Sequence, residues 1–281
     1  GDKVMIQPPV YHPFAWVTTR NERTLVINPL KWENGMYRMD LDAFREQIKG
    51  CKLFILCNPH NPGGVVWTEA ELRAIADICY DEKVLVFSDE IHADLTLPPH
   101  THRPFATVSE KARMNSVTFM SPSKAFNMPG LSASHALIFN EDLRKRFRIY
   151  MDAGELDMGH VFAFLSVEAA YSHGTEWLDQ CLAYIQGNID FVDEFLKKHA
   201  PKIKAIRPEA SYLVWLDCRE LKLSQKDLNE FFVDKAHLAL NDGEMFGKEG
   251  IGFMRLNVAS PRCIIEKAMK QLADAYQLYI K

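Results

Sequence analysis

The stretch Ser-Pro-Ser-Lys-Ala-Phe-Asn-Met-Pro-Gly, residues 121–130, comes directly after an apolar run at residues 117–120. It places one lysine, Lys124, among hydroxyl groups, prolines and a glycine, just past the end of a predicted strand. Open α/β sheets bind ligands at this edge. A lysine that is desolvated near other cations can attack a carbonyl group and form a Schiff base. The alternative for any single lysine is an ordinary loop residue, so the rest of the chain must decide.

The composition limits the class of protein. The chain has 281 residues, of which 47% are hydrophobic and 25% charged, which is ordinary for a globular protein of about two domains. A net charge of −4 without a long Lys/Arg run argues against nucleic acid or a membrane surface as the main partner. No apolar run reaches the length of a membrane span, and no signal sequence opens the chain. We therefore expect a cytoplasmic protein.

The metal-ligating residue types also form no recognisable pattern. The six cysteines contain no CxxC pair, so zinc-ribbon and thioredoxin-like interpretations have no support. His100 and His102 could form a metal pair with Asp94 nearby, but a zinc site needs three or four converging ligands. We expect reduced cysteines and no metal site.

The first part of the chain alternates strands and helices. Strands are predicted at 4–7, 24–28, 52–57, 84–88, 116–120 and 134–138. Asp40 can cap a helix at 41–48, Asn140 one at 141–153, and Thr68 with Glu71 forms a capping box for a helix ending near 81. The strand–helix–strand unit at 52–88 predicts a parallel pair, which needs helices on the faces of the sheet.

The last part changes character after a long helix predicted at 175–199, where apolar residues recur at spacings of three and four. Short strands at 204–207, 212–217, 237–240 and 253–257 then alternate with helices opened by Ser224 and by Ser260-Pro261. We predict an α/β fold with a large, mostly parallel domain at 1–175 and a smaller α+β domain at 176–281. Trp67, Trp177 and Trp215 are interpreted as packing residues.

Three further polar residues are placed where they could act with Lys124. Asp89 follows the strand 84–88, and its carboxylate could keep a ring nitrogen protonated; the alternative is a helix cap or a solvated charge. Asn61, in a Pro-Gly-Gly loop, could donate to a phenolate or a substrate carboxylate, or simply form an Asx turn. Arg255 lies inside the apolar run 252–257, where a charge is costly unless it is paired. Its alternative is an edge-strand arginine facing water.

The motifs NPHNPGG (58–64), SDEIH (88–92) and SPSKAFNMPG (121–130), in this order and spacing, resemble the fold type I pyridoxal-phosphate enzymes of the aminotransferase class I/II superfamily. Longer segments of the sequence, such as LCNPHNPGGVVW and GFMRLNVASPR, look like the MalY/PatB branch of cystathionine β-lyases and C–S lyases. The likeness runs from residue 1 to about residue 277. It implies a pyridoxal-phosphate transferase-like fold, an amino-acid substrate and a homodimer.

The resemblance also assigns roles to residues of the cofactor site. Lys124 would hold pyridoxal 5'-phosphate covalently and act as the catalytic base, and Asp89 would pair with the pyridine nitrogen. Asn61 would bond the 3-oxygen of the cofactor. Ser121 matches the phosphate-binding serine, with Ser123 as an assisting group.

The roles of the remaining residues follow in the same way. Tyr11 occupies the place of the aromatic that stacks on the ring, with an ordinary core tyrosine as the alternative. Arg255 would grip the substrate α-carboxylate, with Asn61 beside it. His92 stands where typical aminotransferases carry a tyrosine, and Ser132 where many carry a phosphate-binding arginine; both departures favour the lyase branch.

The resemblance therefore implies a C–S β-lyase of the cystathionine β-lyase type, which carries out α,β-elimination on sulfur-bearing L-amino acids and gives thiol, pyruvate and ammonia. The alternatives are an aminotransferase on the same scaffold and a non-catalytic regulatory protein that keeps the fold. The chain opens with Gly1-Asp2-Lys3, without an initiator Met, and reads as part of a longer protein that lacks its N-terminal segment. We expect these 281 residues alone to bind the cofactor weakly or not at all and to be inactive.

Overall fold

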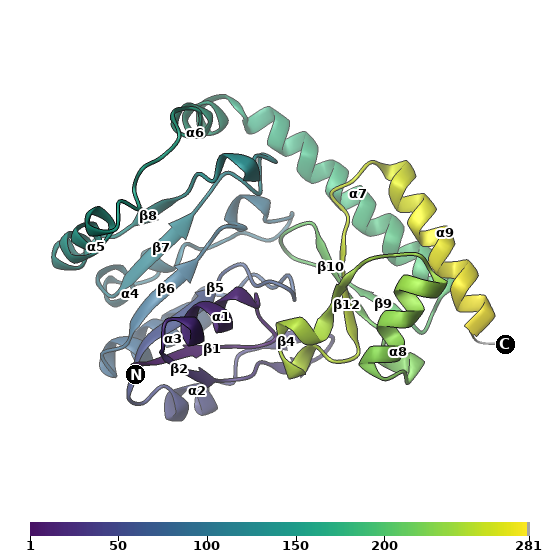
Figure 1. Ribbon diagram of the computed structural model, residues 1–281, viewed down its shortest axis with the longest axis horizontal. Helices are drawn as coiled ribbons and strands as arrows, with labels where there is room; N and C mark the ends of the chain where they lie inside the picture. The colour runs from purple at the N-terminus through teal and green to yellow at the C-terminus, as the bar shows by residue number, and fades with distance from the viewer. Residues whose placement is uncertain (280–281) are drawn as a thin grey trace.

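A six-stranded sheet forms the first half of the molecule (Figure 1). The structure is a computed structural model that describes residues 1–279. The strand order is β2 (Thr24–Ile27), β1 (Lys3–Ile6), β5 (Cys51–Cys57), β6 (Leu85–Asp89), β7 (Ser116–Met120) and β8 (His135–Leu137). Every neighbouring pair is parallel except β7 and β8. The predicted parallel pair of β5 and β6 is therefore confirmed.

The sheet is covered on both faces because its strands bury alternate residues on opposite sides. Phe54 and Leu56 of β5 belong to a large apolar cluster with α2 (Leu41–Gln47), α3 (Glu69–Asp81) and α4 (Glu110–Met114). Ile55 and Cys57 point the other way, toward α1 (Pro13–Arg20). A strand buried on both faces reads as a continuous apolar run, which is why CKLFILC lacks alternation.

A hairpin of β3 (Lys31–Glu33) and β4 (Met36–Arg38) was not predicted. Its turn is Asn34-Gly35, and both residues have positive φ, +52° and +81°. Such a turn suits a two-residue hairpin, so the Asn-Gly pair was the signal that could have revealed it.

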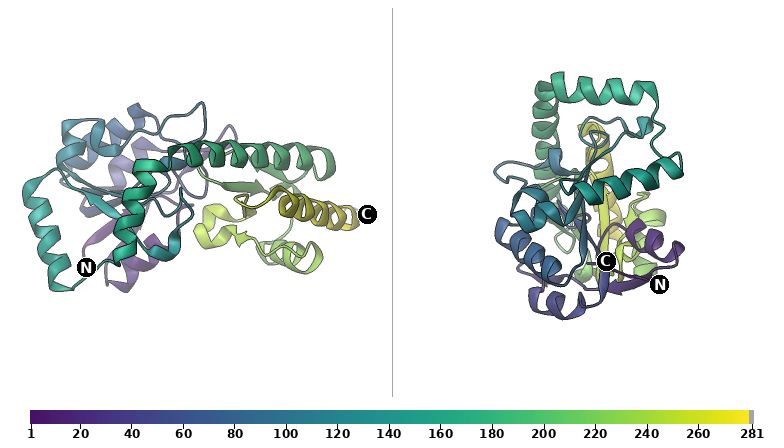
Figure 2. Two further views of the ribbon diagram at one scale, coloured as in Figure 1. Left: turned by 90° about the horizontal axis from the view of Figure 1, so that it is seen from above. Right: turned by 90° about the vertical axis from the view of Figure 1, so that its left-hand side faces the viewer.

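Three helices follow the sheet, α5 (Glu141–Ala153), α6 (Val161–His173) and α7 (Thr175–His199). The views in Figure 2 show α7 running from the first sheet toward the C-terminal part of the chain. The bounds predicted for α5 and α7 are confirmed. No prediction was made for α6, because apolar residues lie on all sides of it and give no amphipathic pattern.

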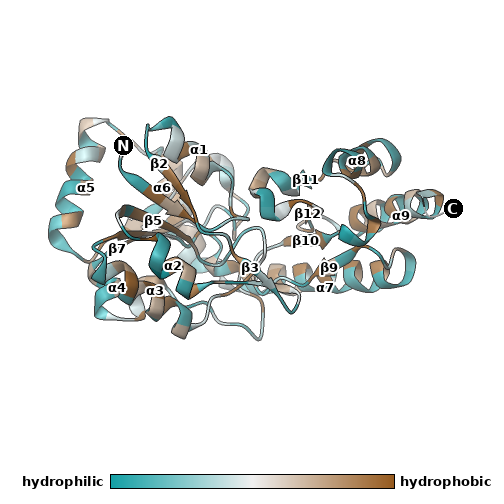
Figure 3. Ribbon diagram, turned by 90° about the horizontal axis from the view of Figure 1, so that it is seen from below, coloured by the Kyte–Doolittle hydropathy of each residue, from teal (hydrophilic) through white to brown (hydrophobic). Residues whose placement is uncertain are grey.

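The C-terminal part is built on a second sheet of order β11 (Asn241–Asp242), β12 (Phe253–Asn257), β10 (Leu213–Asp217) and β9 (Lys204–Ile206), antiparallel throughout. One face packs against α7 and α9 (Arg262–Tyr279), and α8 (Gln225–Glu230) lies beside it. Figure 3 shows brown and teal residues alternating along α7, α8 and α9, as expected of amphipathic helices. No helix within residues 1–279 is long and apolar enough to cross a membrane.

The strand predicted at 237–240 is wrong. A π-helical turn at Phe231–Lys235 precedes it, and the amide of Leu238 donates to the carbonyl of Phe232. His237 has φ of +54°, which is incompatible with an extended strand. The apolar residues Leu238 and Leu240 pack against the second core from an irregular segment instead.

Two of the three tryptophans interpreted as packing residues are confirmed. Trp67 and Trp215 are buried, whereas Trp177 is 49% exposed and its ring stacks on Phe126 beside a cavity. The two sheets have largely separate apolar clusters. The domain boundary near residue 175 stays a prediction.

Candidate active site

Four neighbouring strands of the large sheet end at the same edge, because they are parallel. β1 leads to Tyr11, β5 to Asn61, β6 ends at Asp89, and β7 leads to Lys124. The chain order also reverses between β1 and β5, since β2 lies on one side of β1 and β5 on the other. Such a switch point opens a crevice at the C-terminal edge of the sheet, where ligands bind in this class of fold.

The loop that carries Asn61 is held by contacts at both ends. The amide of Asn61 donates to Sγ of Cys57 at 3.3 Å, and the indole of Trp67 donates to the Cys57 carbonyl at 2.8 Å. Gly64 has φ of +69°, and a Cβ there would lie 2.5 Å from Cβ of Pro208. Only glycine fits this position without strain, so the Pro-Gly-Gly sequence serves to fix the loop.

Asp89 is the last residue of β6, between Cys57 and Phe119 in the sheet register. Its Oδ1 accepts a hydrogen bond from the Ile91 amide at 3.1 Å. Burial raises the pKa of its carboxyl to about 6, with a smaller contribution from Glu90 and an opposing one from Lys124. A cationic partner would stabilise the ionised form of this buried carboxyl.

Glu90, the next residue, ties the edge of the sheet to the segment that follows it. Its carboxylate is buried and accepts from Oγ of Ser88 at 2.7 Å and from the Phe105 amide at 2.8 Å. Nε2 of His102 lies 2.7 Å from its second oxygen. These contacts fix the backbone on the C-terminal side of Asp89.

Lys124 lies in a compact turn built by the serines before it. The Ser123 amide donates to Oγ of Ser121 at 3.0 Å, the two serine hydroxyls share a hydrogen bond of 2.7 Å, and the Phe126 amide donates to the Pro122 carbonyl at 2.8 Å. Ser121 and Ser123 are buried, and Lys124 is partly buried. Among residues 1–279, Lys124 has no ion pair or side-chain hydrogen bond, so its amine is available to a ligand.

Arg255 comes from the second sheet and reaches the same place. Its guanidinium donates to Oδ1 of Asn61 at 2.8 Å and to Oδ1 of Asn241 at 2.7 Å, and lies 4.6 Å from the ring centroid of Phe246. Nε is buried without a partner. Burial lowers its pKa to about 10, so it is still charged at neutral pH. Within the described chain no carboxylate pairs with it, which suits a guanidinium that binds an anionic ligand.

These side chains enclose one cavity of about 320 Å³. Six of the eight site residues predicted from the sequence line it: Tyr11, Asn61, Asp89, His92, Lys124 and Arg255. Ser123 lines a neighbouring cavity, and Ser121 lies behind it in the turn. The arrangement therefore gathers an amine, a carboxyl, an amide and a guanidinium around a space large enough for a small molecule.

The two rings that were predicted at the site differ in exposure. Tyr11 is 38% exposed at the mouth of the cavity, with Phe14 against its edge, so it is not a core tyrosine. His92 is buried, and burial, aided by the charges of Lys124 and Arg255, lowers its pKa to about 3. It is neutral at physiological pH, and its Nδ1 is buried without a partner.

Sequence reasoning missed five residues of the cavity wall, Cys57, Ile91, Tyr212, Leu213 and Asn257. Cys57 and Asn257 end their strands, which was a usable signal. Tyr212 precedes β10, and its ring lies 6.1 Å from that of His92. Burial raises the pKa of Tyr212, which keeps its hydroxyl protonated as a hydrogen-bond donor. Residues 1–279 hold no cluster of three or more potential metal ligands.

An open, mostly parallel sheet that brings a lysine without an ion-pair partner and a buried carboxyl to one edge is typical of an α/β enzyme with a catalytic lysine. Residues 1–272 match the family Aminotransferase class I and II, and the chain belongs to that family. The fold class predicted from the sequence is confirmed by its structural neighbours.

Particular relatives narrow the position within the family. The chain is 38% identical to cystathionine beta-lyase PatB of Bacillus subtilis over 277 residues, which cover 98% of this chain and 72% of that protein. A PLP-bound putative aminotransferase from Clostridium difficile has a TM-score of 0.96 at 41% identity, covering 98% of this chain and 71% of that one. Cystalysin from Treponema denticola, with a pyridoxal 5'-phosphate cofactor, has a TM-score of 0.95 at 35% identity, covering 100% and 72%.

Proposed function

We propose that the protein is a pyridoxal 5'-phosphate-dependent C–S β-lyase that acts on L-amino acids with sulfur on Cβ. This proposal rests on three groups that line one cavity: the Lys124 amine, the buried Asp89 carboxyl and the Arg255 guanidinium, with which no carboxylate of residues 1–279 pairs. The similarity to a cystathionine beta-lyase and to cystalysin supports the choice of reaction.

The residues present fit the cofactor. The Asp89 carboxyl has a pKa of about 6 because burial disfavours its charge, and a protonated ring nitrogen would relieve that cost. Lys124 has an unpaired amine for the cofactor aldehyde, and Nδ1 of His92 is a buried polar atom without a partner. Asn61 would reach the 3-oxygen, the Tyr11 ring would cover a face, and Ser121 and Ser123 would bind phosphate. When bound, the cofactor supplies an electron sink for the Cα of the amino acid.

Arg255 and Lys124 carry out the remaining steps of the reaction. Arg255 binds the substrate α-carboxylate through a two-point fork, and its contact with Asn61 fixes the plane of that fork. Lys124 takes the Cα proton as a general base. The electron pair released at Cα forms the Cα–Cβ double bond while the Cβ–S bond breaks, and its pair leaves on sulfur. The proton held by Lys124 can then pass to that sulfur, and one water completes the conversion to thiol, pyruvate and ammonia.

The test is pyruvate release from cystathionine and from S-methyl-L-cysteine by the full-length protein with pyridoxal phosphate. We expect pyruvate from at least one, its loss in Lys124→Ala, and no change in Lys49→Ala, which alters an exposed lysine paired with Glu46. Absence of pyruvate together with amino transfer to a 2-oxo acid would assign the aminotransferase alternative. Absence of turnover in both assays, together with ligand binding that Lys124→Ala leaves unaltered, would favour the regulatory alternative.

The cytoplasmic location and the homodimer belong to the same proposal. The homodimer follows from the resemblance to fold type I pyridoxal-phosphate enzymes and the cytoplasmic location from the sequence composition, and sedimentation equilibrium of the full-length protein tests the first. The expectation that residues 1–281 are inactive alone stays a prediction.

A further inference from the structure

The guanidinium of Arg255 has a second amide partner, to which the proposed mechanism gives no role. Its Nη1 donates to Oδ1 of Asn61 at 2.8 Å, and its Nη2 donates to Oδ1 of Asn241 at 2.7 Å. Its central carbon lies over the ring of Phe246, 4.6 Å from the centroid. Asn61 follows β5 of the large sheet, whereas Asn241 belongs to β11 of the second sheet. Two parts of the fold therefore hold one guanidinium.

β11 places Asn241 directly opposite Arg255. The two residues are partners in the antiparallel register of β11 and β12, so their side chains lie on the same face of the second sheet. Asp242 comes next and points to the other face. There its carboxylate accepts hydrogen bonds from the side chains of Gln225 and Asn229, each at 2.5 Å. These bonds fix the two-residue strand with its neutral amide toward Arg255 and its carboxylate away from it.

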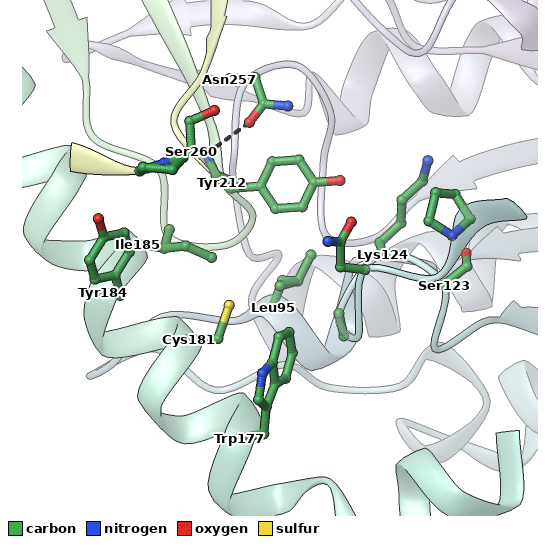
Figure 4. Close-up of a pocket in the computed structure, with 15 residues that line it drawn as sticks. Leu95, Ser123, Lys124, Trp177, Cys181, Tyr184, Ile185, Tyr212, Asn257 and Ser260 are labelled. Carbon is green, nitrogen blue, oxygen red and sulfur yellow. Dashed lines mark hydrogen bonds between the residues drawn. The ribbon is translucent and has the colours of Figure 1, made fainter. Parts of the chain in front are cut away.

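The other amide on the strand of Arg255 already has a partner. Asn257 lies two residues further along β12, and its Oδ1 accepts a hydrogen bond from the Ala259 amide at 2.8 Å (Figure 4). Within residues 1–279, the hydrogen bonds of the Arg255 guanidinium thus go to Asn61 and Asn241, both neutral. A guanidinium has five N–H groups, so several are left for a ligand, including the buried Nε.

We propose that Asn241 is a positioning residue for the α-carboxylate of the substrate, and that it must be neutral. The inference rests on that part of the proposed function in which Arg255 binds the carboxylate. An amide oxygen at this place orients the guanidinium and leaves its charge uncompensated. An aspartate there would form a charge-assisted pair with Arg255 and compete with the substrate for it.

Two substitutions separate orientation from charge. For each, kcat and KM for S-methyl-L-cysteine are measured by pyruvate release from the full-length holoenzyme. Asn241→Ala should raise KM about three- to tenfold, as expected for one lost hydrogen bond to a charged group. Asn241→Asp should raise KM at least about tenfold more, because its carboxylate pairs with Arg255. In both variants kcat should change less than KM, because the lost interaction serves binding.

The matched control is Asn21→Asp. Asn21 is exposed, lies directly after α1 and donates to the carbonyl of Val17 at 2.8 Å, outside the cavity. The same gain of a carboxylate at this position should leave KM unchanged.

An unreactive ligand tests the role of Asn241 without turnover. 3-(Methylthio)propionate keeps the carboxylate and the sulfur of S-methyl-L-cysteine but has no amino group, and 3-(methylthio)propanamide is its neutral counterpart. Ligand-observed NMR titration of the holoenzyme gives Kd for each. The wild type should prefer the carboxylate, and Asn241→Asp should reduce that preference at least about tenfold. A general loosening of the site would weaken both ligands alike and leave their ratio unchanged.

The two assays keep this inference separate from the lyase function. No pyruvate, together with the expected loss of carboxylate preference in Asn241→Asp, overturns the lyase function alone. Pyruvate with the same KM in the wild type and both Asn241 variants overturns the inference alone. An unchanged ratio of affinities in Asn241→Asp, or a wild type without preference for the carboxylate, also overturns the inference.

Discussion

Replacing Asp89 with asparagine should stabilise the cofactor-free protein while weakening its affinity for pyridoxal phosphate. The substitution keeps the shape of the side chain and its acceptor for the Ile91 amide. It removes a carboxyl whose pKa rises from 3.8 to about 6, first because of burial. A shift of about two units corresponds to at most about 3 kcal/mol at 1.4 kcal/mol per unit.

The sign of the pH dependence follows from which state binds more protons. Below pH 3.8 the carboxyl is protonated in both states, and its ionisation costs the folded state nothing. As the pH rises from 3.8 through about 6, the unfolded chain loses this proton before the native state does, so the free energy of unfolding falls. Asp89→Asn should therefore exceed the wild type in unfolding free energy at pH 7, and the difference should vanish near pH 4.

Urea unfolding of both proteins at a series of pH values, after removal of pyridoxal phosphate, measures this difference. Titration with the cofactor should show weaker binding by Asp89→Asn than by the wild type, because only the carboxylate can hold a ring nitrogen protonated. A difference that is absent, or constant from pH 4 to pH 7, would refute the assignment of a buried carboxyl with a raised pKa at this position.

Other predictions concern the elements that support the site. Glu90→Ala should lower the free energy of unfolding by about 3–5 kcal/mol in thermal or urea melts, because it leaves His102 and the Phe105 amide without their hydrogen-bond partner. Glu46→Ala, at an exposed position, should change the free energy of unfolding little, and equal effects of the two substitutions would contradict a buried network. Arg255→Lys should raise KM for amino-acid substrates at least about tenfold while leaving cofactor absorbance intact, since an ammonium cannot form the two-point fork; an unchanged KM would remove Arg255 from substrate binding. Gly64→Ala should lower the free energy of unfolding by more than about 1 kcal/mol, because Gly64 has a positive φ, and it should weaken cofactor binding by shifting the Asn61 loop. An unchanged free energy of unfolding and cofactor affinity would show that the loop relaxes freely.

The elements that the sequence predicts well are those whose signals are local. The capping box of Thr68 and Glu71 and the cap at Asn140 set the start of α3 and α5 where they were expected. The parallel order of β5, β6 and β7 follows from the helical crossovers between them. The grouping of Asp89, Asn61 and Lys124 then follows from strand ends that share one edge.

The features that were missed depend on tertiary contacts. α6 has no polar face to reveal its period, and the segment at 237–240 looks like a strand because Leu238 and Leu240 are apolar, although their backbone follows a π-helical turn. Tyr212 and Asn257 reach the site from the second sheet, at the ends of strands about 90–130 residues after Lys124 in the chain. Trp177 reads as a core residue, and only the packing of α7 against the lysine turn shows that it borders a cavity.

Borohydride reduction of the full-length protein with pyridoxal phosphate, followed by peptide mass analysis, tests whether Lys124 is the residue that holds the cofactor. We predict one phosphopyridoxyl group on the peptide that contains Ser123, Lys124 and Ala125, and none in Lys124→Ala. A label on another lysine, or no label at stoichiometric cofactor, would contradict it.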